Sequence, residues 1–114
     1  LAYSAYSYYG NGRKKGDSNY TIAYVGTQAN KLPQAVDAML DLMNDMPEAQ
    51  KQFEATKTAT LKKIAAERIT KSNIFWKYEG LKNRGIDHDN REEIYKEVEK
   101  MTMNDLKDFF NENI

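Results

Sequence analysis

The chain has 114 residues, of which 40% are hydrophobic and 30% charged, a balance typical of a folded domain or a large part of one. Basic and acidic residues number 17 each, so the net charge of zero argues against nucleic-acid binding and against a polybasic membrane anchor. There is no cysteine, which excludes disulfides and thiolate metal sites. No apolar run reaches the roughly 18 to 20 residues of a membrane helix, and the composition indicates no particular compartment.

Residues 1–29 are predicted to form a β-hairpin. Segment 1–9 alternates loosely and carries tyrosines on both faces, which is typical of a strand covered at least partly on each side. Segment 20–28 is the second strand, and the Gly- and Asn-rich residues 10–19 form the turn, where we expect Arg13, Lys14 and Lys15 to keep the loop soluble. A lone hairpin is marginally stable in water. Because the chain begins inside a strand, we expect further strands and other parts of the protein upstream of residue 1.

The chain changes from strand to helix after Gln28. Asn30 is the expected N-cap and Pro33 fits a first helical turn, where its missing N–H is not needed. Pro47 is expected to end this helix or to begin the next. Segment 48–69 is rich in helix formers and carries a narrow apolar stripe, which predicts a helix on the outside of a sheet. The apolar residues at helical spacing are Leu32, Val36, Met39, Leu40 and Met43 in the first helix, and Phe53, Leu61, Ile64 and Ala65 in the second.

Three further helices are predicted in the rest of the chain. Residues 70–73 form a break and a cap, followed by an aromatic helix in which Trp76 is expected to lie in the core and which ends near Gly85. Residues 89–92 and 102–105 resemble capping boxes, the second with Asp in place of Glu. The sequence therefore predicts an α+β fold: a hairpin over 1–29 and about five helices over 30–114, together forming one partial domain.

The only histidine, His88, is the first candidate for chemistry. A zinc site normally takes three or more protein ligands, and this sequence has no second histidine and no His-Glu-x-x-His pattern or its inversion. We therefore interpret His88 as a surface residue that precedes a helix cap. A serine–histidine–aspartate triad would need a serine activated by His88, and nothing in the sequence marks one.

Tyrosine is the second candidate, since four of the eight tyrosines lie within the first nine residues. A phenol can donate a hydrogen bond to a peptide carbonyl or to an oxyanion, and it can also pack at a sheet boundary. Packing is the preferred interpretation for Tyr3, Tyr6, Tyr8 and Tyr9 considered one by one. Residues 26–28 at the end of the second strand could present backbone to an extended peptide, although a strand-to-helix turn is the simpler interpretation.

A family resemblance adds to this picture. The segments LAYS at 1–4, YVGTQ at 24–28, KLPQAV at 31–36 and VEKMTMNDL at 98–106 resemble, in order and spacing, the C-terminal half of the insulinase-like zinc peptidases, the pitrilysin or M16 family. The resemblance implies two similar halves that close around a peptide-binding chamber. The N-terminal half of such proteins carries the zinc and an inverted His-x-x-Glu-His motif, and the C-terminal half contributes substrate contacts.

The resemblance assigns one site residue in this chain. Tyr3 matches the tyrosine of the family's substrate-binding segment, while the arginine that precedes it in that segment would lie upstream of Leu1. No catalytic residue, zinc ligand or other cofactor site is expected here; zinc is expected in the N-terminal half, on the same or a separate chain. The implied function is that of a non-catalytic substrate-binding domain of a peptidase that uses a zinc-activated water. Two alternatives stay open: an inactive relative serving as a scaffold, peptide-binding or assembly module, and an unrelated α+β interaction domain.

Overall fold

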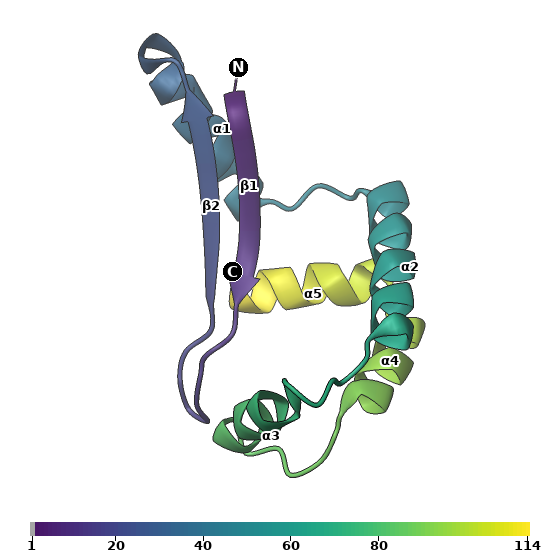
Figure 1. Ribbon diagram of the computed structural model, residues 1–114. Coiled ribbons are helices and arrows are strands. Elements are labelled where there is room, and N and C mark those ends of the chain that lie inside the picture. The colour runs from purple at the N-terminus through teal and green to yellow at the C-terminus, as the bar shows by residue number, and fades with distance from the viewer. Residues whose placement is uncertain (1) are drawn as a thin grey trace.

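The computed structural model describes residues 2–114 and has the predicted α+β architecture, with a two-stranded antiparallel sheet followed by five α-helices. Leu1, which belongs to the expected first strand and to the LAYS segment, lies outside the described residues. The hairpin occupies one side of the molecule and helices α2 and α4 the other, with α5 running between them (Figure 1). Helix α3 lies beside the loop of the hairpin.

The hairpin pairs β1 (Ala2–Gly10) with β2 (Tyr20–Thr27). Its loop is closed by side chains: Asn19 Oδ1 accepts from the Gly12 amide at 2.9 Å, and Asp17 Oδ2 accepts from the amides of Arg13 and Lys14 at 3.1 and 2.9 Å. These bonds take the place of regular ladder bonds over a turn that is too long for a tight two-residue connection. The expected hairpin and its long turn are therefore confirmed.

The hairpin loop is fastened to the end of α3 (Ile74–Asn83), because the Lys15 amide donates to the Asn83 carbonyl at 2.8 Å. Gly85, with φ of +78°, ends the helix, and the amides of Gly85 and Ile86 fold back to carbonyls of the last turn. This arrangement is a Schellman cap, which needs a left-handed residue after the helix. The predicted glycine cap is confirmed, and the helix end also serves as a docking point for the hairpin.

The first helix begins differently from the prediction. A 3-10 turn, η1 (Ala29–Lys31), precedes α1 (Leu32–Asn44), and Asn30 lies inside that turn and is not an N-cap. Pro33 does occupy the first turn of α1, as expected. Since α1 ends at Asn44, Pro47 lies in the linker and neither ends this helix nor begins α2.

Helix α2 (Gln50–Ala66) packs against α4 (Arg91–Lys100) and stands apart from the hairpin, so the prediction that it covers a sheet is wrong. Lys57 of α2 donates its Nζ proton to the carbonyl of Met101, at 3.0 Å, and thereby caps the end of α4. An apolar stripe indicates that a helix has a partner but not whether that partner is a sheet or another helix.

Two of the three predicted helix caps in the second half of the chain do not form. Asn73 Oδ1 accepts from the Thr70 amide at 2.9 Å and so closes the turn before α3 instead of capping the helix. Asp89 Oδ2 is held by the Arg91 guanidinium, 2.6 Å from Nη2, and Asp89 Oδ1 accepts from the Arg91 amide at 3.1 Å; the N-cap residue Asn90 makes no side-chain cap bond, so the predicted capping box with Glu92 does not form.

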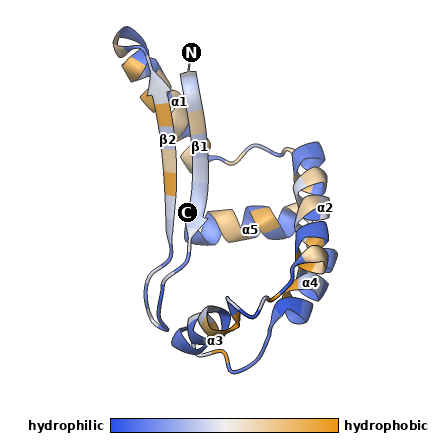
Figure 2. Ribbon diagram, viewed as in Figure 1, coloured by the Kyte–Doolittle hydropathy of each residue, from blue (hydrophilic) through white to orange (hydrophobic). Residues whose placement is uncertain are grey.

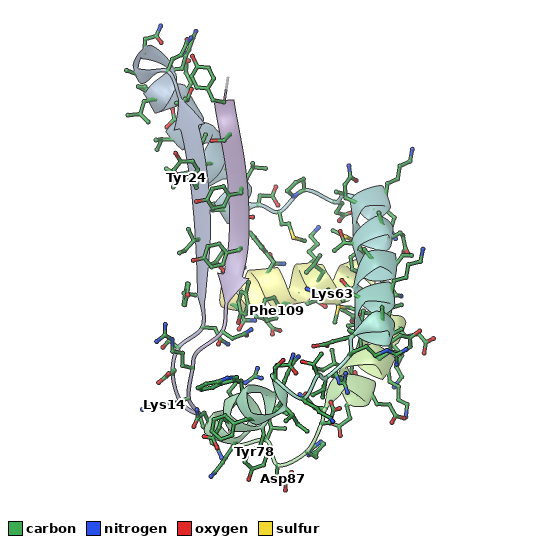
Figure 3. The ribbon with its side chains drawn as sticks, in the orientation of Figure 1. Lys14, Tyr24, Lys63, Tyr78, Asp87 and Phe109 are labelled. Carbon is green, nitrogen blue, oxygen red and sulfur yellow. The ribbon has the colours of Figure 1, made fainter. Side chains whose placement is uncertain are left out.

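The third cap does form, and it begins α5 (Met103–Asn113). The Asp105 amide donates to Thr102 Oγ1 at 3.3 Å, and the Thr102 amide donates to Asp105 Oδ2 at 2.7 Å. From this start α5 reaches the hairpin, where the ring of Phe109 meets that of Tyr9 edge to face with centroids 5.8 Å apart (Figure 3). The first strand and the last helix are thus joined through an aromatic contact.

The described chain buries little of its apolar surface. Among residues 3–114, whose exposure is described, only Ala35 of α1 is buried, and Trp76, expected in the core, is 71% exposed. The radius of gyration is 17.4 Å, compared with about 13 Å for a compact chain of this length. Hydrophobic residues are spread over the hairpin and several helices and do not gather at one centre (Figure 2). Large apolar faces are consequently available for contacts beyond this chain.

Candidate functional site

Three of the four N-terminal tyrosines pack against other rings. Tyr6 stacks on Tyr24 across the hairpin with centroids 5.0 Å apart, and Tyr8 meets Tyr20 edge to face at 6.2 Å. Tyr9 contacts α5, as described above. Partial loss of solvent around its phenol, together with the neighbouring Tyr20, raises the pKa of Tyr8. The packing interpretation of these three residues is confirmed.

Tyr3 differs from the other three. Ala2 pairs with Thr27 and Ser4 with Gly26, so Tyr3 is the extra residue of a β-bulge in β1. Its side chain is 77% exposed, and none of the ring contacts in the described part of the chain involves it. A bulge interrupts the ladder and turns a side chain away from the regular alternation, a device often found beside functional sites. The phenol of Tyr3 is therefore free to meet a ligand.

The edges of the hairpin are the second part of this candidate site. Within residues 2–114 the two strands pair only with each other, so each has one edge at which no further strand is paired. Such an edge can accept an extended peptide as an additional strand. After Thr27 the chain enters η1, where the Lys31 amide donates to the Gln28 carbonyl at 2.9 Å. The strand-to-helix turn expected at residues 26–28 is therefore confirmed.

His88 lies in the loop between α3 and α4, next to Asp87 (labelled in Figure 3). Its Nδ1 is 2.8 Å from Asp87 Oδ1, and its Nε2 is 2.6 Å from Glu93 Oε1. Hydrogen bonds from its ring to the carboxylates of Asp87 and Glu93 raise the pKa of His88, because a carboxylate at each ring nitrogen favours the imidazolium. With both ring nitrogens hydrogen-bonded, His88 is a surface residue that links Asp87 to Glu93 at the start of α4, in agreement with the sequence interpretation. We call this arrangement the His88 clamp.

No cluster of three or more metal-ligating side chains occurs among the residues that the structure describes. Within the same residues, every helix is too short or too polar to span a lipid bilayer.

A cleft between α2, α3 and α4 was missed by the sequence reasoning. Two ion pairs border it: Lys77 with Glu67, and Arg91 with Asp89. Hydrogen bonds from the Arg91 guanidinium lower the pKa of Asp89 to about 2, and a hydrogen bond from Lys77 lowers that of Glu67. The residues that line the cleft come from three helices and the segments between them, from Ile64 to Ile94, so only the folded arrangement brings them together. One local signal was present: Gly80 interrupts a helix without ending it.

Comparisons with protein-family models, curated proteins and solved structures found no match to this chain.

Proposed function

We propose that this chain is the non-catalytic, substrate-binding domain of an M16-like zinc peptidase. The proposal rests on the resemblance of four segments to that family and on the arrangement of the hairpin. In the hairpin, strand β1 combines an open edge with an exposed tyrosine, Tyr3, at a bulge within the LAYS segment. This combination is the observation that supports a peptide-binding role most directly, because an extended peptide needs both backbone partners and a side chain that fixes its register.

The uncovered apolar surface supports a large partner. The hairpin and α1 expose large side chains that a solitary domain would bury, among them Tyr24, Leu32 and Leu40. In the proposed assembly they face the zinc-bearing N-terminal half, on the same or a separate chain. Zinc held by that half activates the attacking water when bound. The role of this chain is to hold the peptide in an extended form at the β1 edge.

Tyr3 has a specific task in this proposal. Its phenol donates a hydrogen bond to the substrate carbonyl, and the same donor stabilises the negative charge that develops on that oxygen as the peptide bond is attacked. A donor aimed at a developing oxyanion contributes to kcat as well as to binding.

Peptide binding by the chain itself provides the first test. An unstructured peptide added to the ¹⁵N-labelled protein should shift the amide resonances of β1 residues more than those of α2 residues. Tyr3→Phe should weaken binding, whereas Tyr6→Phe should not, since Tyr6 stacks on Tyr24 and a phenylalanine ring preserves that stack. Shifts spread evenly over the molecule, or equal effects of the two variants, would contradict a peptide site at β1.

A second candidate is an assembly module without peptidase activity. It is favoured by α3, which exposes Ile74, Phe75, Trp76 and Tyr78 at a place where peptide binding along β1 does not require them. This face would serve a protein contact. Peptide hydrolysis by the assembled protein distinguishes the two candidates. Assembly with the partner without hydrolysis of any peptide supports the assembly module, and hydrolysis supports the peptidase.

A further inference from the structure

The cleft between α2, α3 and α4 has a volume of about 320 Å³, near the lower end of the range for small-molecule sites. Its lining includes three aliphatic side chains, one from each helix, which we call its apolar floor: Ile64, Leu81 and Ile94. Trp76 of α3 and Arg84, the residue that follows this helix, also line it. An apolar floor with a few charged groups at its margin is the usual composition of a site for a small organic ligand.

Gly80 keeps this cleft open. It lies inside α3 and lines the cleft, and a Cβ atom built at Gly80 would have no neighbour within 4 Å. Glycine inside a helix costs about 0.5–1 kcal/mol relative to alanine, so packing does not explain its presence here. Because Gly80 has no side chain, it leaves space in the cleft one helical turn before Arg84.

The charges at the margin are unbalanced in favour of cations. The carboxylate of Glu67 is held by Lys77, and that of Asp89 by Arg91. Arg84 has no carboxylate partner among the described residues, and only its Nε is used, donating to the Gly80 carbonyl at 3.2 Å. The outer nitrogens of this guanidinium remain available, and their planar geometry matches a carboxylate group.

Trp76 supplies an apolar surface beside this cation. It is the only tryptophan of the chain, and it is 71% exposed. Its ring meets that of Phe75 edge to face, with centroids 5.1 Å apart, which orients the indole without covering it. An apolar group bound over the floor of the cleft would bury part of this ring.

We propose that the cleft binds a carboxylate that carries an adjoining apolar or aromatic group. Arg84 pairs with the carboxylate, Gly80 gives it room, and Trp76 with the apolar floor takes the neighbouring group. This chemistry occurs in the C-terminal residue of a peptide and in free arylalkanoic acids. The inference concerns helices α2 to α4 and is independent of the proposed role of Tyr3.

Intrinsic fluorescence tests the proposal directly, because Trp76 is the only indole. The full chain is titrated with acetyl-Gly-Gly-Phe bearing a free carboxylate, with the same peptide as its C-terminal amide, and with 3-phenylpropionate. We expect a saturable change with the free acid, with a Kd on the order of 1 mM or below, and at least tenfold weaker binding of the amide. Binding of 3-phenylpropionate as tight as that of the peptide acid identifies a free carboxylic acid as the source, and weaker binding identifies a peptide C-terminus. Equal responses to acid and amide, or none to any probe, would overturn the proposal.

Three variants locate the site. Arg84→Gln should weaken binding of the acid about tenfold or more, while Arg68→Gln, which removes a nearby charge that does not line the cleft, should change it less than threefold. Gly80→Leu fills the cleft and should abolish the saturable response while leaving the circular dichroism and the thermal midpoint unchanged or raised. Undiminished binding by Gly80→Leu would place the ligand elsewhere and refute the assignment, even if Arg84→Gln failed to fold.

Discussion

Two glycines on either side of the end of α3 should respond in opposite directions to the same substitution. Gly80 lies within the helix, and its Cβ position is open. Gly85 follows the helix with φ of +78°, and a Cβ there would lie 3.1 Å from Cδ of Lys15. Gly80→Ala should therefore raise the free energy of unfolding, and Gly85→Ala should lower it.

The magnitudes follow from the backbone. Alanine inside a helix is favoured over glycine by about 0.5–1 kcal/mol. Alanine in the left-handed region costs roughly 1–2 kcal/mol. The Lys15 contact adds little, because the side-chain stem of Lys15 can move aside. The two variants should thus differ from each other by about 1.5–3 kcal/mol, with the wild-type protein between them.

Urea denaturation followed by circular dichroism at 222 nm and by Trp76 fluorescence measures both effects. The midpoint should move up for Gly80→Ala and down for Gly85→Ala with an unchanged slope, because neither variant alters the surface exposed on unfolding. A neutral Gly85→Ala would refute the Schellman cap and with it the docking of the hairpin loop on α3. A destabilising Gly80→Ala would show that the space beside α3 is filled in solution.

Three further predictions concern the remaining features of the chain. His88 is the only histidine, and its ring-proton NMR signal should titrate with a midpoint above about 6.5, the ordinary pKa of a histidine. Glu93→Gln should lower that midpoint, because it removes one of the two carboxylates bonded to the ring. A midpoint at or below about 6.5 in the wild-type protein would contradict the clamp. Because the folded-state pKa is the raised one, the stabilising effect of His88 is complete below pH 6.5 and is lost as the pH rises through the folded-state value. Thr102→Ala removes the capping box and should lower the free energy of unfolding by about 1 kcal/mol in the same urea assay, with Thr102→Ser as a nearly neutral control; equal losses in both variants would argue against the cap. Metal analysis of the purified chain after dialysis against EDTA and readdition of zinc should show no stoichiometric zinc, whereas about one tightly bound ion per chain would contradict the assignment of zinc to the other half.

Local signals in the sequence predicted local structure well. Segments rich in tyrosine and in β-branched residues predicted the two strands. Gly85 predicted a helix end and Thr102 a helix start, and the structure confirms both. These features depend on the residue itself and on neighbours within a few positions, so one stretch of sequence contains the whole interaction.

The sequence did not predict which of several partners a side chain would choose. Asp89 had the spacing of a capping box, but its carboxylate is bound mainly by the Arg91 guanidinium and accepts only one amide of α4, that of Arg91 itself. Trp76 had the character of a core residue but lies exposed, because no other part of the described chain covers its ring. The bulge at Tyr3 depends on the pairing of two strands and the cleft on three helices, and neither arrangement is encoded in one segment.

The central claim, that β1 holds a peptide for a zinc peptidase through Tyr3, is tested most directly by peptide hydrolysis in the full-length protein. The measurement compares kcat/KM of Tyr3→Phe with that of Tyr6→Phe and of the wild-type protein on one quenched fluorescent peptide. Tyr3→Phe should lower kcat/KM by roughly ten- to a thousand-fold, and Tyr6→Phe should leave it unchanged, since the ring stack with Tyr24 persists. An unchanged kcat/KM for Tyr3→Phe would contradict the proposed role.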